Sequence, residues 1–167
     1  MRDSAGAAVV EEDQKRRIVA ALRECRVTIP KQGRLVAEVP RDSLVSLLLL
    51  LKADGFEHLS MISCVDWIDA GELELVYHLW SYEKKVHVMA KTRIGREAPR
   101  FLSIIPIFRH AQTYEREIHE MFGVEFEGNP RQVPFLLDHW QGPPPMRKDF
   151  DLRRHATETF GVEEKAL

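Results

Sequence analysis

The stretch LELVYHLWSYEKKVHVMA, residues 73–90, is the most informative part of the sequence because it predicts two strands joined by a tight connection. Large apolar side chains occupy every second position from Leu73 to Leu79, which is the period of a strand with one buried face. Residues 81–84 (SYEK) connect this strand to a second one over Val86–Ala90. The sequence therefore predicts a β-hairpin, and the other elements are placed around it.

Two further strands are predicted on the N-terminal side of this hairpin. Residues 35–39 (LVAEV) form a short strand that Pro40 ends, because proline cannot donate a hydrogen bond within a sheet. The second strand covers Phe56–Val65, and the alternation of its side chains places three of them on one face: Leu59, Met61 and Val65.

Helices are predicted from apolar periodicity and end signals over Glu11–Cys25, from Asp42 or Ser43 to Ala53, over Pro99–Ile105 and over Thr113–Phe122. Leu47–Leu51 is apolar on every side, so we expect the second helix to be largely buried. Gly123 ends the fourth helix, whose expected buried stripe consists of Tyr114, Ile118, Met121 and Phe122. Because strands and helices do not alternate regularly, the predicted class is α+β, a mixed or antiparallel sheet with helices mainly on one face.

The chain divides into three predicted parts. Residues 1–10 are weakly patterned and expected to be frayed, residues 11–123 form the α+β domain, and residues 124–167 form an extended tail. Five of the nine prolines lie between Pro130 and Pro145, which disfavours helices and central strands there. The tail nevertheless carries large apolar side chains that must be buried: Phe126, Phe135, Leu136, Leu137, Trp140 and Phe150. We expect the tail to wrap around a partner protein, and the alternative is that it folds back on its own domain.

Composition excludes several functions. There are 24 Lys and Arg against 26 Asp and Glu, a balance that argues against nucleic-acid binding. Cys25 and Cys64 are too few and too far apart for a zinc or iron–sulfur site, so we expect no metal and no cofactor in this chain. The longest apolar run, residues 44–51, is much too short to span a membrane. The composition predicts a cytosolic globular domain.

The densest polar cluster is Glu115–Glu120 (EREIHE) on the predicted fourth helix. Positions four apart are neighbours on a helix, so Glu115 is expected to pair with His119, and Arg116 with Glu120. His119 and Glu120 also begin the zinc-protease pattern HExxH, but its second histidine is replaced by Gly123. We therefore favour a solvated or partner-facing charged helix over a catalytic one and expect no catalytic residue.

Two segments of the chain carry a resemblance to a known family. Residues 114–130 (YEREIHEMFGVEFEGNP) are followed at residues 136–150 by Leu-Leu, Trp140, Gly142 and the block PMRKDF. Together they resemble the C-type subunit, the 30-kDa subunit, of NADH-quinone oxidoreductase (respiratory complex I). The resemblance covers roughly residues 56–150.

The resemblance implies a subunit without a redox centre in the peripheral arm, at the cytoplasmic face of the membrane. Its implied partners are the D-type subunit, which is similar to the large subunit of hydrogenases, and the small iron–sulfur subunit, and the membrane arm is reached only indirectly. The motif residues that would form the partner interface are Glu115, Arg116, Glu117, His119, Glu120, Phe122, Gly123, Gly128, Pro130, Trp140, Gly142, Arg147, Lys148 and Asp149.

Two departures from the respiratory pattern stand out. His119-Glu120 replaces the usual Tyr-Asp, and Met146 replaces the usual Leu. The His-Glu version resembles relatives in energy-converting membrane-bound hydrogenases, formate hydrogenlyase and F420H2 dehydrogenases. The alternatives are therefore a subunit of a [NiFe] hydrogenase or formate hydrogenlyase type of complex, and a stand-alone hydrolase that uses His119 and Glu120.

Overall fold

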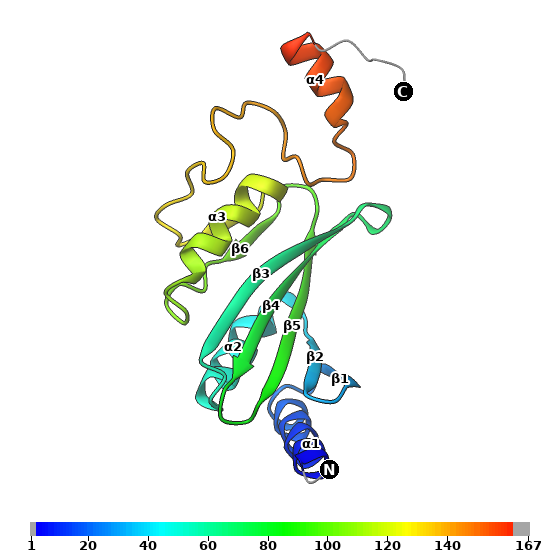
Figure 1. Cartoon of the computed structure of the whole chain (residues 1–167), viewed down its shortest axis with the longest axis vertical. Helices are drawn as coiled ribbons and strands as arrows, with labels where there is room; N and C mark the ends of the chain where they lie inside the picture. The colour runs from blue at the N-terminus through cyan, green and yellow to red at the C-terminus, as the bar shows by residue number, and fades with distance from the viewer. Residues whose placement is uncertain (1–2, 162–167) are drawn as a thin grey trace.

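The computed structural model describes residues 3–161, and Figure 1 shows an α+β arrangement followed by a long C-terminal tail. The main sheet is mixed and has the strand order β1-β2-β5-β4-β3. Its strands are β1 (Arg26–Lys31), β2 (Arg34–Glu38), β3 (His58–Trp67), β4 (Glu72–Ser81) and β5 (Val86–Gly95). Neighbours are antiparallel except β2 and β5, which are parallel.

The hairpin predicted from residues 73–90 is confirmed as β4 and β5. Tyr77 pairs with Ala90 and Leu79 with Val88, and the alternate side chains from Leu73 to Leu79 are all fully buried. The strands predicted over 35–39 and 56–65 are confirmed as β2 and β3, whereas β1 was not predicted. Only two of the six residues of β1, Val27 and Ile29, are large and apolar, which is too short an alternation to signal a strand.

Helices α1 (Asp3–Ala21) and α2 (Leu44–Ala53) pack against the sheet, α1 on β1 and α2 on β5. A short 3-10 turn, Arg41–Ser43, leads into α2. Helix α3 (Ala111–Phe122) lies along the edge strand β3, where the side chains of His110 and Tyr114 donate to the backbone carbonyls of Leu59 and Ser60. None of the helices within residues 3–161 combines the length and the apolar character needed to cross a membrane.

Several predicted boundaries and faces were wrong. Helix α1 begins at Asp3 instead of Glu11, so residues 3–10 are helical, which fits the high helix propensity of their alanines. Residues 1 and 2 of the segment expected to be frayed lie outside the described part. In β3 the register shifts between Leu59 and Met61, so Ile62 is buried while Met61 and Val65 are exposed.

The predicted helix over Pro99–Ile105 is a strand. Residues Arg100–Leu102 form β6, which pairs in parallel with β7 (Glu125–Glu127) in a small second sheet. Phe101 and Phe126 lie opposite each other in this pair and are both buried, so their burial outweighs the local helix signal. The burial of helix α2 was also overestimated, because the side chain of Leu49 is exposed.

The tail contains more regular structure than the sequence indicates. Besides β7 it includes a helix, α4 (Leu152–Phe160), whose first turn is capped by the Asp151 carboxylate through the backbone N–H groups of Arg153 and Arg154. Figure 1 shows the tail looping past α3 and ending in α4, well beyond the sheet. Residues 162–167 of the predicted tail lie outside the described residues.

Candidate interaction site around helix α3

Glu115 is fully buried, contrary to the expected surface pair with His119. Its carboxylate accepts hydrogen bonds from the Ser103 hydroxyl at 2.8 Å, the Ile104 backbone N–H at 2.8 Å and the Asn129 side-chain amide at 2.9 Å. The donors follow β6 and β7 in the chain. Glu115 therefore joins α3 to the segments after both short strands, and its role is to position them.

Burial raises the pKa of Glu115 above its ordinary value of 4.5, although its three donors act in the opposite direction. The unfolded chain releases this proton near the ordinary value, whereas the folded protein holds it to higher pH. Between these two pKa values the folded state binds more protons than the unfolded state does. The free energy of unfolding therefore falls as the pH rises through the folded pKa of Glu115.

We therefore expect Glu115→Gln to remove a pH-dependent loss of stability. The difference in unfolding free energy, wild type minus variant, should decline as the pH rises from about 4.5 through the folded pKa. Urea unfolding of both proteins at a series of pH values measures this difference. The exposed Glu97, changed to Gln, is the matched control. A difference that does not vary with pH would show that Glu115 titrates as an ordinary carboxylate.

Arg116 and Glu120 do not pair with each other as predicted, but both bind the tail. The Arg116 guanidinium donates to the backbone carbonyls of Val133 at 3.3 Å and Pro134 at 2.9 Å, and it lies 4.9 Å from the centre of the Phe135 ring. The Glu120 carboxylate accepts three successive backbone N–H groups, from residues 135, 136 and 137, at 2.8–3.0 Å. These two side chains, one helical turn apart, hold segment 133–137 on α3.

Glu120 is consequently held as a carboxylate. Burial raises its pKa, but the three N–H donors and the nearby Arg116 together bring the pKa below the ordinary value of 4.5. Glu120 is not free for general base chemistry, because its carboxylate accepts these three N–H groups. The Nδ1 of His119 is 2.9 Å from the Val124 carbonyl, to which it donates, and this bond fixes the orientation of the ring. The arrangement binds backbone and does not assemble a nucleophile with a base.

The C-terminal end of α3 is closed by the tail. Gly123 has φ +75°, a left-handed conformation that favours glycine, and a Cβ added there would lie 2.9 Å from a Pro144 side-chain carbon. The Arg147 guanidinium donates to the Phe122 carbonyl at 2.7 Å, where a cation also complements the helix dipole. The predicted site residues Phe122, Gly123 and Arg147 are thus brought together, and Phe122 itself is buried.

Asp66, near the end of β3, binds the block PMRKDF (residues 145–150), which is the second motif block of the family resemblance. Its carboxylate accepts two hydrogen bonds from the Arg96 guanidinium, at 2.8 and 3.1 Å, and one from the Lys148 backbone N–H at 2.9 Å. Arg96 also reaches Asp149 at 2.6 Å. The hydrogen bonds from Arg96 lower the pKa of Asp66 and of Asp149, so both remain charged. The residues Lys148 and Asp149 are therefore tied to the sheet of their own chain.

The remaining predicted residues are more scattered. Trp140 forms an aromatic cluster with Phe150 and His155, and a Cβ on Gly142 would lie 2.8 Å from atoms of Trp140 and His155. Gly128 adopts φ +94° and Pro130 is exposed. Glu117 is half-buried and makes no hydrogen bond or ion pair with any residue between 3 and 161.

Sequence reasoning did not single out Arg96, Ser103 or Asn129 as site residues. Asn129 lies inside the quoted motif, so the resemblance offered a signal for it. Arg96 and Ser103 lie in loops without a motif, and only the folded chain brings them to Asp66 and Glu115.

The tail is held on its own domain but leaves large apolar side chains exposed. The exposed fractions are 47% for Val133, 40% for Phe135, 55% for Leu136, 57% for Met146 and 64% for Leu152. The tail therefore folds back on its domain through polar contacts, while apolar side chains that the sequence analysis expected to be covered remain accessible.

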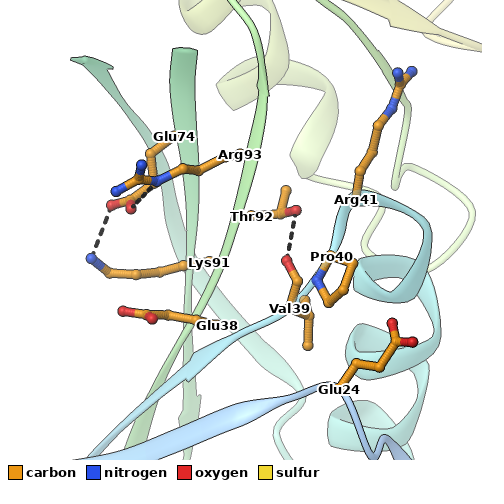
Figure 2. A pocket seen from close by; sticks show the side chains of 9 residues that line it. All are labelled: Glu24, Glu38, Val39, Pro40, Arg41, Glu74, Lys91, Thr92 and Arg93. Carbon is orange, nitrogen blue, oxygen red and sulfur yellow. Dashed lines mark hydrogen bonds and ion pairs between the residues drawn. The ribbon is translucent and has the colours of Figure 1, made fainter. Parts of the chain in front are cut away.

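A separate hollow of about 330 Å³ lies at the ends of β2, β4 and β5 (Figure 2). Three of its six charged side chains are engaged with one another, since the buried Glu74 contacts Lys91 at 2.9 Å and Arg93 at 3.6 Å. The Thr92 hydroxyl donates to the Val39 carbonyl at 3.0 Å. We assign no ligand to this hollow. Within residues 3–161, no three His, Cys, Asp or Glu side chains converge as metal ligands would.

Comparison with known proteins places these residues in a family. Residues 37–156 match the model of the family described as "Respiratory-chain NADH dehydrogenase, 30 Kd subunit". The C-type subunit of the F420H2 dehydrogenase of Methanosarcina mazei is 37% identical over 120 residues, which are 71% of this chain and 76% of the relative. The NADH-quinone oxidoreductase C/D polypeptide of Bdellovibrio bacteriovorus is 33% identical over 121 residues, 71% of this chain but 21% of the longer relative.

A solved structure agrees over nearly the whole chain. A chain of the membrane-bound sulfane sulfur reductase, an archaeal respiratory membrane complex, has a TM-score of 0.85 and 34% identity, with 93% of this chain and 94% of that chain covered. The match includes the tail as well as the sheet.

Proposed function

The chain belongs to the family of the 30-kDa subunit of respiratory-chain NADH dehydrogenase, and we propose that it is a non-catalytic assembly subunit of a membrane-bound, ion-translocating oxidoreductase related to complex I. In this proposal it lies in the peripheral arm at the cytoplasmic face and is held at the membrane through other subunits. It contributes to electron transfer only by stabilising the subunits that carry the redox centres.

One observation carries the proposal. The two motif blocks hold the tail on α3 and on β3 through polar contacts, yet the apolar side chains of that tail stay exposed. Large apolar side chains gathered on one segment are typical of a protein–protein interface. An active site uses polar groups that can contact a substrate, whereas here the carboxylates of Glu115, Glu120 and Asp66 each accept three hydrogen bonds from their own chain.

The proposed partner is the D-type subunit, which is similar to the large subunit of hydrogenases, with the small iron–sulfur subunit nearby. The name of the Bdellovibrio relative joins the letters C and D, and the matched part is 21% of its length. A polypeptide that includes both subunits keeps them at high effective concentration, which supports direct contact between them.

We also propose that the chain carries no redox centre of its own. Metal-binding and reactive cysteines are thiolates. Burial raises the pKa of Cys25 to about 11 and that of Cys64 to about 12, so both thiols stay protonated at neutral pH. Any iron–sulfur cluster would belong to the partner subunits.

The second candidate is a [NiFe] hydrogenase or formate hydrogenlyase type of complex instead of an NADH- or F420H2-quinone oxidoreductase. The similarity to an archaeal respiratory membrane complex other than NADH dehydrogenase supports it over an NADH-quinone oxidoreductase. The His119-Glu120 pair does so as well, but it does not separate this candidate from an F420H2 dehydrogenase. The stand-alone hydrolase loses support, because the carboxylate of Glu120 is occupied by three backbone N–H groups of its own chain and is not available to act with His119.

Purification of the tagged full chain from membranes of its native host tests the proposal. We expect it to co-purify with a D-type subunit and a small iron–sulfur subunit in equal amounts. The other components identify the complex: an NADH-oxidising flavoprotein, an F420H2-oxidising subunit or a nickel-containing large subunit. Recovery of the chain as an active monomer, without these proteins, would contradict the proposal.

A further inference from the structure

Five backbone polar groups of segment 133–137 are satisfied by two side chains of helix α3. The carbonyls of Val133 and Pro134 are bound by Arg116, and the N–H groups of the next three residues are bound by Glu120. Pro134 has no N–H to satisfy. Five backbone groups are therefore paired by two side chains of one helix, although the segment belongs to no strand.

This pairing determines what kind of surface can cover the segment. An extended segment with free backbone groups is normally recognised by strand addition, which supplies hydrogen bonds to those groups. Here those five groups already have partners, so an apolar surface can cover them without leaving them unsatisfied, which would be costly. The outward part of the segment is uncharged from Gln132 to Leu137, and Val133, Phe135 and Leu136 are exposed there.

We propose that Arg116 and Glu120 act as a latch that holds residues 133–137 in one fixed conformation, with Val133, Phe135 and Leu136 presented as a preformed strip that docks onto an apolar surface of the D-type subunit. The inference rests on the proposed function and adds to it the residues that position the strip and the apolar character of its partner surface. Ordering this segment before binding removes an entropic cost that the complex would otherwise bear.

Two variants separate the latch from the strip. Glu120→Gln keeps the shape of the side chain but replaces one acceptor oxygen by a donor that faces the N–H groups of the tail. Leu136→Ser leaves the latch intact, because only the backbone of Leu136 contacts Glu120. Glu97→Gln, on an exposed residue between β5 and β6, is the control for a change of charge.

The experiment measures two quantities on the full-length chain. Amide exchange and ¹H–¹⁵N spectra report the hydrogen bonds of residues 135–137, and titration with the purified D-type subunit reports affinity. We expect Glu120→Gln to lose the protection of all three amides and to weaken binding at least about tenfold, which corresponds to about 1.4 kcal/mol. Leu136→Ser should keep the amides protected and weaken binding to a similar degree, and Glu97→Gln should change neither quantity.

Other results would overturn the inference. Unchanged amides in Glu120→Gln would show that no latch exists, and wild-type affinity of Leu136→Ser would show that the strip does not dock. If sedimentation shows that the wild type self-associates and that Leu136→Ser abolishes this, the occupant is a second copy. Failure of the wild-type chain itself to bind would instead contradict the proposed function, and is distinguishable because it precedes any comparison of variants.

Discussion

Removal of residues 129–167 is expected to leave a folded domain that no longer binds its partner subunit. All of the buried hydrophobic residues among the described residues lie at or before Phe126, so the truncation removes none of the core. It does remove the strip at residues 133–137 and the other exposed apolar side chains of the tail. The domain should therefore melt cooperatively, while affinity for the D-type subunit should fall at least about a hundredfold.

The truncation also has a smaller cost in stability. It removes Asn129 from Glu115, the bond of Arg147 to the end of α3 and the contact of Lys148 with Asp66. Each hydrogen bond to a charged group is worth about 1.5–3 kcal/mol, so the melting temperature should fall. Circular dichroism melting and a pull-down measure the two effects, with a chain ending at Gly161 as the control. Non-cooperative melting would show that the tail is part of the domain, and retained tight binding would show that the partner does not need the tail.

Asp66→Ala is expected to be strongly destabilising. The Asp66 side chain is 2% exposed and accepts two hydrogen bonds from Arg96, whose own side chain is 15% exposed. Loss of one partner of a buried ion pair costs about 3–5 kcal/mol. Arg96 keeps its contact with Asp149 at 2.6 Å, which compensates part of its charge, so we expect a cost near the lower end of this range. Urea unfolding measures this cost, and the exposed Asp69, changed to Ala, is the control. A cost below about 1 kcal/mol would show that this ion pair contributes no more to stability than a solvent-exposed pair does.

The pH dependence of Asp66 runs opposite to that of Glu115. Arg96 lowers the pKa of Asp66 below its ordinary value of 3.8. Its contribution is therefore fully present above that ordinary value and is lost as the pH falls through the folded pKa.

Local patterns were enough to predict much of this fold. The alternation in β4, the Gly123 stop of α3 and the helix over residues 44–53 all depend on periodicity or on a single end signal. Local patterns predicted the wrong element for Pro99–Ile105. The strand β6 exists there only because it pairs with β7, which lies more than twenty residues later in the chain. The shifted register of β3 has no local signal either.

The site was likewise predictable only in part. The resemblance predicted Arg116, Glu120 and Arg147 as residues of a partner interface, and the structure places all three in contacts between α3 and the tail. Their contacts were not predictable, because they bind backbone groups, which every residue has, and so leave no pattern in the sequence. Glu115 was assigned to the surface because His119 lies four positions away, but its actual partners come from two distant loops.

The single parallel pair in the main sheet has a consequence for the order in which the protein is made. Residues 34–38 pair with residues 87–91, and β4 and β3 are added on the far side of β5. During synthesis β1 and β2 leave the ribosome well before β5 exists, so they can pair with each other but not with the rest of the sheet. Parallel pairing between distant segments forms late because the chain between them must first be closed. The N-terminal third of the protein must therefore wait for the central hairpin, and α1 and β1 have no complete sheet to join until about half of the chain has been synthesised.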